Sequence, residues 1–320
     1  TGNVTTMNSA FSGKTNFNED LSSWNTSQVT DFSEMFNGCS VFNNGATGNS
    51  GNNPLTWDTA SALYMHKMFY NCYVFNQELI FTTSSAISFD SMLANAFEFN
   101  NGDPGDNSAK PLTSWVTSKV TDMSHMFFKA GNFNQDLSGW DTGNVVKMDR
   151  MFHGVEGVST WSHASRFNQD LSSWDTGKVT TMNRMFRLAT AFNNGDNGDN
   201  NTHPLLFSAV DGTAPSKWDT ENVTDMEYMF YRAMDFNQDI SNWNTHAVTN
   251  MQEMFGNCHV FNQDLSGWDT GEVTWMGQMF GNCHVFNNDG NSLSWDTSKV
   301  TAMWGMFWSA RVFNQDIGDW

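Results

Sequence analysis

One block of sequence is repeated along the chain, and this repetition constrains the fold more than any other feature. The block FNQDLSGWDTGEVTWMGQMF runs from Phe261 to Phe280 and recurs with small changes from Phe133, Phe167 and Phe236. Aligned on a corner motif, V-T-x-M, the chain holds eleven repeats, and the commonest spacing is 25 residues. The motif begins at Val4, Val29, Ala62, Ala86, Val120, Val145, Val179, Val223, Val248, Val273 and Val300.

A repeat of 20 to 50 residues is typical of a solenoid or a propeller. A propeller blade needs about 40 residues and four strands, which is more than this repeat supplies. We therefore expect one solenoid domain of about eleven coils over residues 1–320. A solenoid grows by stacking and needs no single globular core.

Within a repeat, the apolar pattern predicts two elements. The residues from Met276 to Cys283 are apolar at i, i+3, i+4 and i+7, which is the stripe of a short amphipathic helix. Upstream, residues 265–270 alternate as a half-buried strand does. The expected fold class is thus an α+β repeat solenoid, with a parallel sheet of short strands on one side and short helices on the other.

Identical residues recur in register, which predicts ladders of stacked side chains. Buried Trp, Phe and Met columns would supply the hydrophobic core. The Asn that follows the Phe in every repeat would hydrogen-bond its neighbours and cap the corner. Members of these expected ladders include Trp140, Trp174, Trp268, Phe255, Met254, Met279 and Asn262.

Four insertions interrupt the regular spacing. Three of them are rich in Gly, Asn, Asp and Pro, and the other follows the end of an expected helix. We interpret all four as loops, and loops on one side of a solenoid often form its binding edge. Their ranges are 44–54, 101–111, 153–166 and 194–217. Two of them hold the acidic runs NGDPGD and NGDNGD, whose composition suits calcium, although a purely polar loop explains them too. The candidate ligands are Asp103, Asp106, Asp196 and Asp199.

Cysteine and histidine give two further candidate sites. Cys39 and Cys72 occupy the same position in adjacent repeats, as do Cys258 and Cys283. Equivalent positions in stacked coils lie about 5 Å apart, so two disulfides would fit, and so would a column of small buried residues. His259 and His284 follow two of these cysteines, but adjacent residues point in different directions, which disfavours a zinc site.

A column of carboxylates follows the Trp column. It predicts an acidic stripe, made of Asp58, Asp141, Asp175, Asp219, Asp269 and Asp296. The stripe is either a solvated face, in which each Asp bonds its own turn, or a surface for cations, carbohydrate or a partner. Threonine columns also suggest ice binding, but these threonines should face inward or cap the corner.

Composition excludes several functional classes. The net charge of −19 argues against nucleic acid and anionic membranes as partners. The chain has no stretch of about 20 apolar residues, so we expect no segment of it to span a bilayer. Carboxylates are spread by the repeat and not gathered in a pocket, so we expect no enzyme. Neither end carries a polar capping repeat, so we expect a segment of a longer array, or ends that neighbours cover.

The repeat F-N-Q-D-L-S-x-W-D-T-x-x-V-T-x-M-x-x-M-F resembles that of the BspA-type leucine-rich-repeat surface proteins. The resemblance covers nearly the whole chain, and the repeats at Ala62 and Ala86 are its weakest copies. It implies leucine-rich-repeat-like coils, an extracellular or cell-surface location and, in some members, adhesion. It implies no catalytic residue and no specific ligand.

These observations predict an extracellular structural or adhesive repeat protein of a cell surface, coat or filament. It would act through extended surfaces and through end-to-end or lateral packing, with copies of itself or other surface proteins as partners. The alternative is a calcium-dependent module that binds glycans or proteins.

Overall fold

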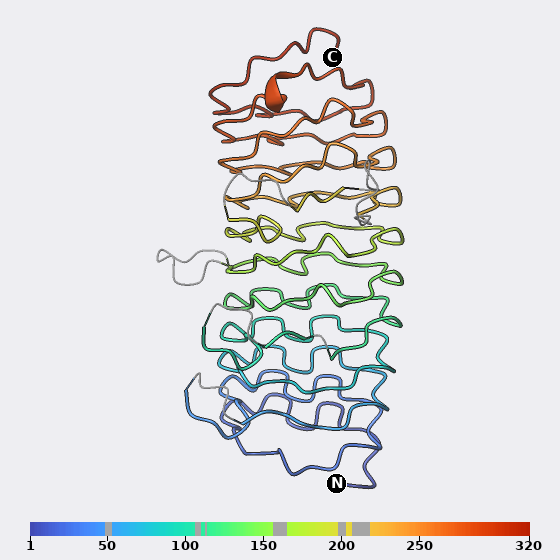
Figure 1. Cartoon of the computed structure of the whole chain (residues 1–320), viewed down its shortest axis with the longest axis vertical. Coiled ribbons are helices and arrows are strands. Elements are labelled where there is room, and N and C mark those ends of the chain that lie inside the picture. Colours follow the sequence, from blue (N-terminus) through green and yellow to red (C-terminus); the bar gives the residue numbers. More distant parts are fainter. Residues whose placement is uncertain (49–52, 106–109, 113, 156–164, 198–202, 207–217) are drawn as a thin grey trace. The chain divides into compact units, whose positions relative to one another are not determined.

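A computed structural model describes residues 1–48, 53–105, 110–112, 114–155, 165–197, 203–206 and 218–320. The chain forms two compact units, one of Thr1–Val145 with Met151–Phe167 and the other of Val146–Arg150 with Asn168–Trp320. Within each unit, every repeat makes one circuit of chain, and consecutive circuits lie above one another (Figure 1).

Parallel bridges set the vertical register of the stack. The third residue of the corner motif pairs with the same residue of the next repeat, as Asn250 does with Trp275 and Trp275 with Ala302. The series runs from Thr6 to Asp122 in one unit and from Lys147 to Ala302 in the other. Equivalent residues of consecutive repeats are therefore neighbours within each unit.

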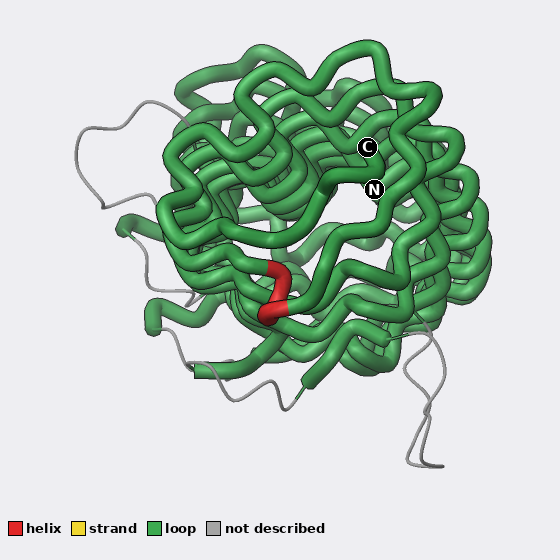
Figure 2. Tube along the Cα trace, turned by 90° about the horizontal axis from the view of Figure 1, so that it is seen from above, coloured by secondary structure: helices red, strands yellow, loops and turns green. Residues whose placement is uncertain are grey.

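The predicted α+β fold class is wrong. Among the described residues there is no α-helix and no continuous strand, and the one helical element is the 3-10 turn η2, Asn288–Gly290 (Figure 2). Isolated bridges replace a sheet. All the paired bridges but Leu55–Leu79 lie at the corner motif, whereas the strand was predicted over residues 265–270. The predicted helix after Met276 is a run of turns.

This run of turns, called the turn run below, forms because some of its backbone amides bond within the segment and others bond to the next repeat. The Met279 N–H donates to the carbonyl of Met276, three residues back, at 3.2 Å. The amides of Met276 and Gln278 instead donate to the next repeat, to the carbonyls of Ala302 and Trp304, both at 2.8 Å. In an α-helix, each amide beyond the first turn would bond to a carbonyl of its own segment. The hydrogen bonds between repeats therefore replace the helical ones.

Residues with left-handed backbone angles also distinguish the turn run from an α-helix. Gln278 has φ 49° and Asn282 has φ 60°, and the preceding repeat repeats the pattern at Glu253 and Asn257. One such residue every four positions is incompatible with a right-handed helix. The apolar spacing that suggested a helix is nevertheless kept, because consecutive three-residue turns also return Met and Phe to the interior.

Side-chain ladders fill the interior of each unit. The indoles of Trp243 and Trp268 lie 6.2 Å apart and nearly parallel, and the rings of Phe255 and Phe280 lie 5.7 Å apart. Trp140 and Trp174 are buried, each in its own compact unit. Met254 and Met279 have no exposed surface.

The asparagine ladder joins side chain to backbone. Asn262 Oδ1 accepts the N–H of Asn287 at 2.7 Å, while the Asn262 N–H donates to Asn237 Oδ1 at 2.9 Å. Where a glutamine follows the asparagine, as Gln263 does, its Nε2 also donates to Asn237 Oδ1, at 3.0 Å. The asparagine column thus caps backbone N–H groups of the neighbouring repeat, and its side-chain partners are glutamines and not the asparagines that were expected.

Candidate functional site

The eleven repeats can be compared with one another, because they share one backbone. The inward columns hold the same residue types in almost every repeat. The turn run differs, because the residue types at four of its positions vary widely among the repeats. We call these positions the turn face, defined as the third, fifth, sixth and ninth residues counted from the first residue of the corner motif.

Tyrosine and arginine side chains pack together on the turn face of the repeats at Val179 and Val223. The Arg184 guanidinium lies 2.9 Å from Glu227 Oε2 and 4.8 Å from the ring centre of Tyr228. The Tyr228 hydroxyl donates to Glu253 Oε1 at 2.9 Å. Burial and this carboxylate raise the pKa of Tyr228, while burial lowers the pKa of Arg187, whose guanidinium also covers Tyr228.

Three large indoles are exposed on the turn face of the last two repeats. Trp275 is 47% exposed, Trp304 51% and Trp308 62%. Trp304 lies against Gly277 of the preceding repeat, where an added Cβ would come within 2.6 Å of the indole Nε1. Sequence reasoning placed the tryptophans in the core and missed this surface. The sequence did carry a signal, namely the place of these three tryptophans in the repeat. They stand outside the W-D-T motif, which supplies the buried Trp column.

The acidic stripe is exposed or half-buried, and each of its carboxylates engages its own turn. Asp269 Oδ1 accepts the N–H of Gly271 at 3.0 Å, and the other five members make the same bond to the residue two positions on. Hydrogen bonds from Ser298, and then the charge of Lys299, lower the pKa of Asp296. The turn-bonding interpretation therefore describes these residues, and cation or partner binding by the stripe stays a prediction.

The candidate calcium residues of the insertion loops are engaged inside the protein. Asp103 and Asp196 are each 6% exposed. Asp103 Oδ1 accepts the Gly105 N–H at 2.8 Å. Asp196 Oδ2 accepts Gln238 Nε2 at 2.9 Å, and its Oδ1 lies 3.0 Å from His203 Nδ1. Across the described residues, no three His, Cys, Asp or Glu side chains are grouped to hold a metal. Asp106 and Asp199 lie outside the described residues.

Three of the insertion loops share one closing contact that the sequence did not suggest. The second Asn of the F-N-N motif donates from Nδ2 to a carbonyl nine residues later, as Asn44 does to Asn53 at 2.9 Å and Asn101 to Lys110 at 2.8 Å. Asn194 donates to His203 in the same way. This contact joins the two ends of the loops at 44–54 and 101–111, and in the loop at 194–217 it joins residues 194 and 203. Residues 156–164 of the fourth loop are outside the described chain.

The four cysteines are buried free thiols. Each Sγ donates to a backbone carbonyl of the preceding repeat, as Cys283 does to Phe255 at 2.9 Å. The expected disulfides are therefore not supported. Burial raises the pKa of Cys39 to about 11 and that of Cys283 to about 12. His259 is exposed and stacks on His284 at 5.1 Å, so these rings lie on the outside while the neighbouring thiols point inward.

Comparison with known proteins gives one family. A model described as a Mycoplasma protein of unknown function, DUF285, matches residues 1–107, 103–209 and 205–320 in tandem. No curated protein and no solved structure is significantly similar to the chain. The resemblance to BspA-type leucine-rich repeats is not confirmed. No helix in the described part of the chain is long and apolar enough to cross a bilayer. The three matches together cover the chain from end to end, so the protein belongs to the DUF285 family.

Proposed function

We propose that this protein is an extracellular adhesive or structural repeat protein of a cell surface, and that it contacts its partner through the turn face. The observation that carries this proposal is the contrast between constant and varied columns. The interior and the W-D-T column repeat one pattern, whereas the turn face changes chemistry from repeat to repeat. An outward residue on a stacked scaffold can change without disturbing the ladders, so such positions are suited to recognition.

The distribution of polar bonds supports the same face. The carboxylates of the acidic stripe hold the turns beside them, and the loop carboxylates bond within the protein. The turn face, in contrast, carries exposed aromatic and cationic groups that the scaffold does not require, among them Tyr64 and Trp275. Exposed aromatic side chains and arginines are the residues most enriched where proteins bind partners.

Two measurements test this proposal. Antibody labelling and protease shaving of intact cells should find the protein outside the membrane, and protection until lysis would contradict the location. Beads that carry residues 1–320 should adhere to cultured animal cells. Replacing Tyr228, Tyr231 and Trp275 by Ala together should reduce adhesion, whereas Asp141→Asn with Asp269→Asn on the stripe should not. Equal adhesion of the two variants would overturn the assignment of the face.

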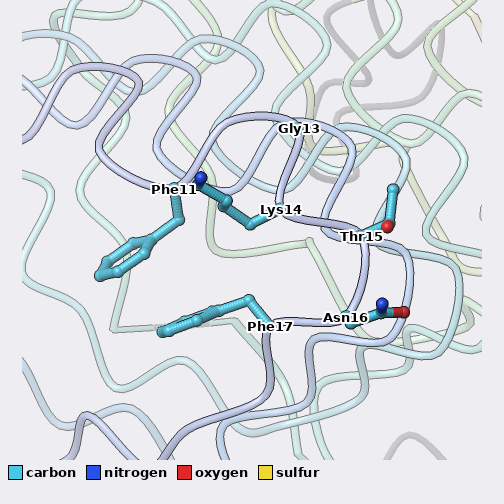
Figure 3. A pocket seen from close by; sticks show the side chains of 6 residues that line it. All are labelled: Phe11, Gly13, Lys14, Thr15, Asn16 and Phe17. Atoms are coloured by element: carbon cyan, nitrogen blue, oxygen red, sulfur yellow. The ribbon is translucent and has the colours of Figure 1, made fainter.

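A second candidate function, end-to-end assembly, has an observation of its own. The edge rings are half-buried, whereas their interior equivalents are fully buried. Phe11 and Phe17 stack 4.1 Å apart and line a hollow together with residues 13–16, and their side chains point to the same side (Figure 3). At the other edge, Phe313 lies 6.0 Å from the buried Phe286. Each edge therefore presents ring faces that another repeat of the same kind would cover.

Backbone groups at the two edges are complementary by register. Alternate amides of each turn run donate to carbonyls of the following repeat, as Gln278 does to Trp304. The last repeat therefore carries the equivalent donors and the first repeat the equivalent acceptors. A copy of residues 1–320 that stacked in register would extend the ladders, and a contact of this kind does not close on itself, so it would produce fibres.

Sedimentation velocity and electron microscopy of purified residues 1–320 test assembly. We expect concentration-dependent fibres that Phe313→Asp abolishes, because a carboxylate would then be buried between ring faces. Trp308→Asp is the matched control, since Trp308 lies in the same repeat but on the turn face. A monomer at every concentration would contradict this candidate.

A further inference from the structure

The turn face of the last three repeats is almost free of charge, although the protein as a whole is strongly acidic. In the repeats at Val248, Val273 and Val300, its twelve positions include one charged side chain, Glu253. The two preceding repeats place four charged residues on their eight positions, namely Arg184, Arg187, Asp225 and Glu227. All these repeats belong to the same compact unit. The turn face of the last three repeats therefore suits a less charged ligand than that of the two preceding repeats.

Indole and amide groups replace the charges there. Trp275, Trp304 and Trp308 are accompanied by the half-buried Gln252 and Gln278, and by the half-buried Asn282, which follows the ninth position of its repeat. We call these six residues the indole–amide patch. Its apolar area lies in flat aromatic surfaces, and its polar atoms are neutral groups that both donate and accept hydrogen bonds.

We propose that the indole–amide patch binds a neutral carbohydrate, with the indoles stacking on sugar rings and the amides bonding to hydroxyl groups. This inference rests on the proposed surface role and names its ligand class. A pyranose ring has an apolar face of C–H groups and a rim of neutral hydroxyls, so it matches an uncharged surface of this composition. A nucleic acid or an acidic glycan would need cations, and the patch has none.

The scaffold holds at least one indole in place. Trp304 lies against Gly277, which is itself buried, and a side chain at position 277 would have to displace the ring. The indole thus rests on backbone on one side, while half of the side chain remains exposed. Trp275 is 47% exposed although the following repeat lies beside it, so its exposure belongs to the face and not to the edge of the stack.

Two of the three amide side chains, those of Asn282 and Gln278, keep hydrogen-bonding atoms for a ligand, whereas Gln252 Nε2 donates to the Tyr228 hydroxyl at 3.4 Å. Asn282 Nδ2 donates to Asn257 Oδ1 at 3.1 Å, which fixes the side chain and leaves its oxygen for a ligand. Gln278 runs under Gly305, where an added Cβ would lie 3.1 Å from Gln278 Cγ. Glu253 is not one of the six patch residues, and the Tyr228 hydroxyl of the preceding repeat donates to its Oε1 at 2.9 Å.

Calorimetric titration of residues 1–320 with four linear neutral oligosaccharides tests the proposal. The probes are an α-glucan, a β-glucan, a mannan and a galactan oligomer, and a heparin oligomer serves as the acidic comparison. We expect at least one neutral probe to bind and heparin not to bind. Trp275→Ala with Trp304→Ala should weaken that binding about tenfold or more, since stacked aromatic area dominates such contacts. Gly277→Ala should weaken it several-fold by displacing Trp304.

The matched control is Tyr73→Ala, which removes an exposed aromatic side chain that lies off the turn face, in the other compact unit. It should leave binding unchanged. A second readout needs no variant, because the bound probe should protect Trp275 and Trp304 from oxidation by N-bromosuccinimide, mapped by mass spectrometry. Thermal unfolding of each variant checks that the fold is kept.

Three results would overturn the proposal: no binding of any neutral probe, equal binding by the tryptophan variant, or oxidation that the probe does not slow. Self-association through the patch, lost in Trp304→Ala and indifferent to sugar, would also overturn it in favour of a second copy as occupant. Failure of this inference is distinguishable from failure of the proposed function. Cell adhesion without oligosaccharide binding would contradict the carbohydrate ligand and leave the proposed surface role standing. Oligosaccharide binding by a protein found inside cells would contradict the surface role and leave the ligand standing.

Discussion

At the scale of single residues, stability depends on rings that meet their equivalents above and below. Phe255 has no exposed surface and lies 5.7 Å from both Phe230 and Phe280. Phe255→Ala should lower the free energy of unfolding by about 3–5 kcal/mol, measured by urea denaturation, because the ladder cannot close around the cavity. Tyr64→Ala, at an exposed position, should change it by less than about 0.5 kcal/mol. A loss below about 1 kcal/mol at Phe255 would contradict an interior ladder.

The buried thiols predict how stability depends on pH. Burial raises the pKa of Cys283 to about 12 and that of Cys258 well above its ordinary value. An unfolded thiol ionises near pH 8.5, so stability is intact below that pH and falls as the pH rises toward the folded pKa. At pH 10 each thiol should cost about 1–2 kcal/mol relative to pH 8. The Cys258→Ala, Cys283→Ala double variant should show a shallower decline, and parallel declines would refute this origin.

At the scale of elements, the turn run should depend on its left-handed residues. Asn282 has φ 60°, a region where a β-branched side chain is strained. Asn282→Val should therefore destabilise the protein by roughly 1–2 kcal/mol, while Asn282→Gly should be close to neutral. Asn291→Val is the control, because Asn291 is exposed and has φ −94°. Equal costs at the two sites, measured by urea denaturation, would mean that backbone strain is not the cause.

The same element shows what sequence can predict here. The ladders followed from the sequence because identical residues recur in register and stacking is the one arrangement that buries them all. The helix did not follow, because the spacing from Met276 to Cys283 suits both a helix and a run of turns. The recurring Gly or Asn at the left-handed position, as in Gly38, Asn71 and Asn282, was the signal that separates the two.

The strand was mispredicted for a related reason. Trp268 and Thr270 do point inward on either side of Asp269, so the alternation was interpreted correctly. However, the Thr270 hydroxyl donates to the Asp296 carbonyl at 2.9 Å, and the Trp268 Nε1 donates to the carbonyl of Ile240 at 3.1 Å. Side chains thus make contacts between repeats that a backbone ladder would make in a sheet. The candidate site escaped prediction because the turn face has no repeated pattern.

At the scale of the whole molecule, stability should depend on register and not on the identity of any one repeat. Each repeat contacts its immediate neighbours, so a stack can lose one member and close again. The corner motifs at Val223, Val248 and Val273 are spaced by 25 residues. Deleting residues 248–272 would place Val273 where Val248 stood, and would bring Phe280 over Phe230 in place of Phe255.

This deletion should therefore fold, with a cooperative urea transition and the near-ultraviolet circular dichroism of packed tryptophans. Deleting residues 253–272 removes 20 residues from the same region and displaces the following corner by five positions from its register. The Phe and Asn columns would then fail to meet across the junction, leaving buried amides without the Asn Oδ1 acceptors that cap them, and each such group costs about 1–3 kcal/mol. Equal stability of the two deletions would show that the repeats do not act as interchangeable layers of one ladder.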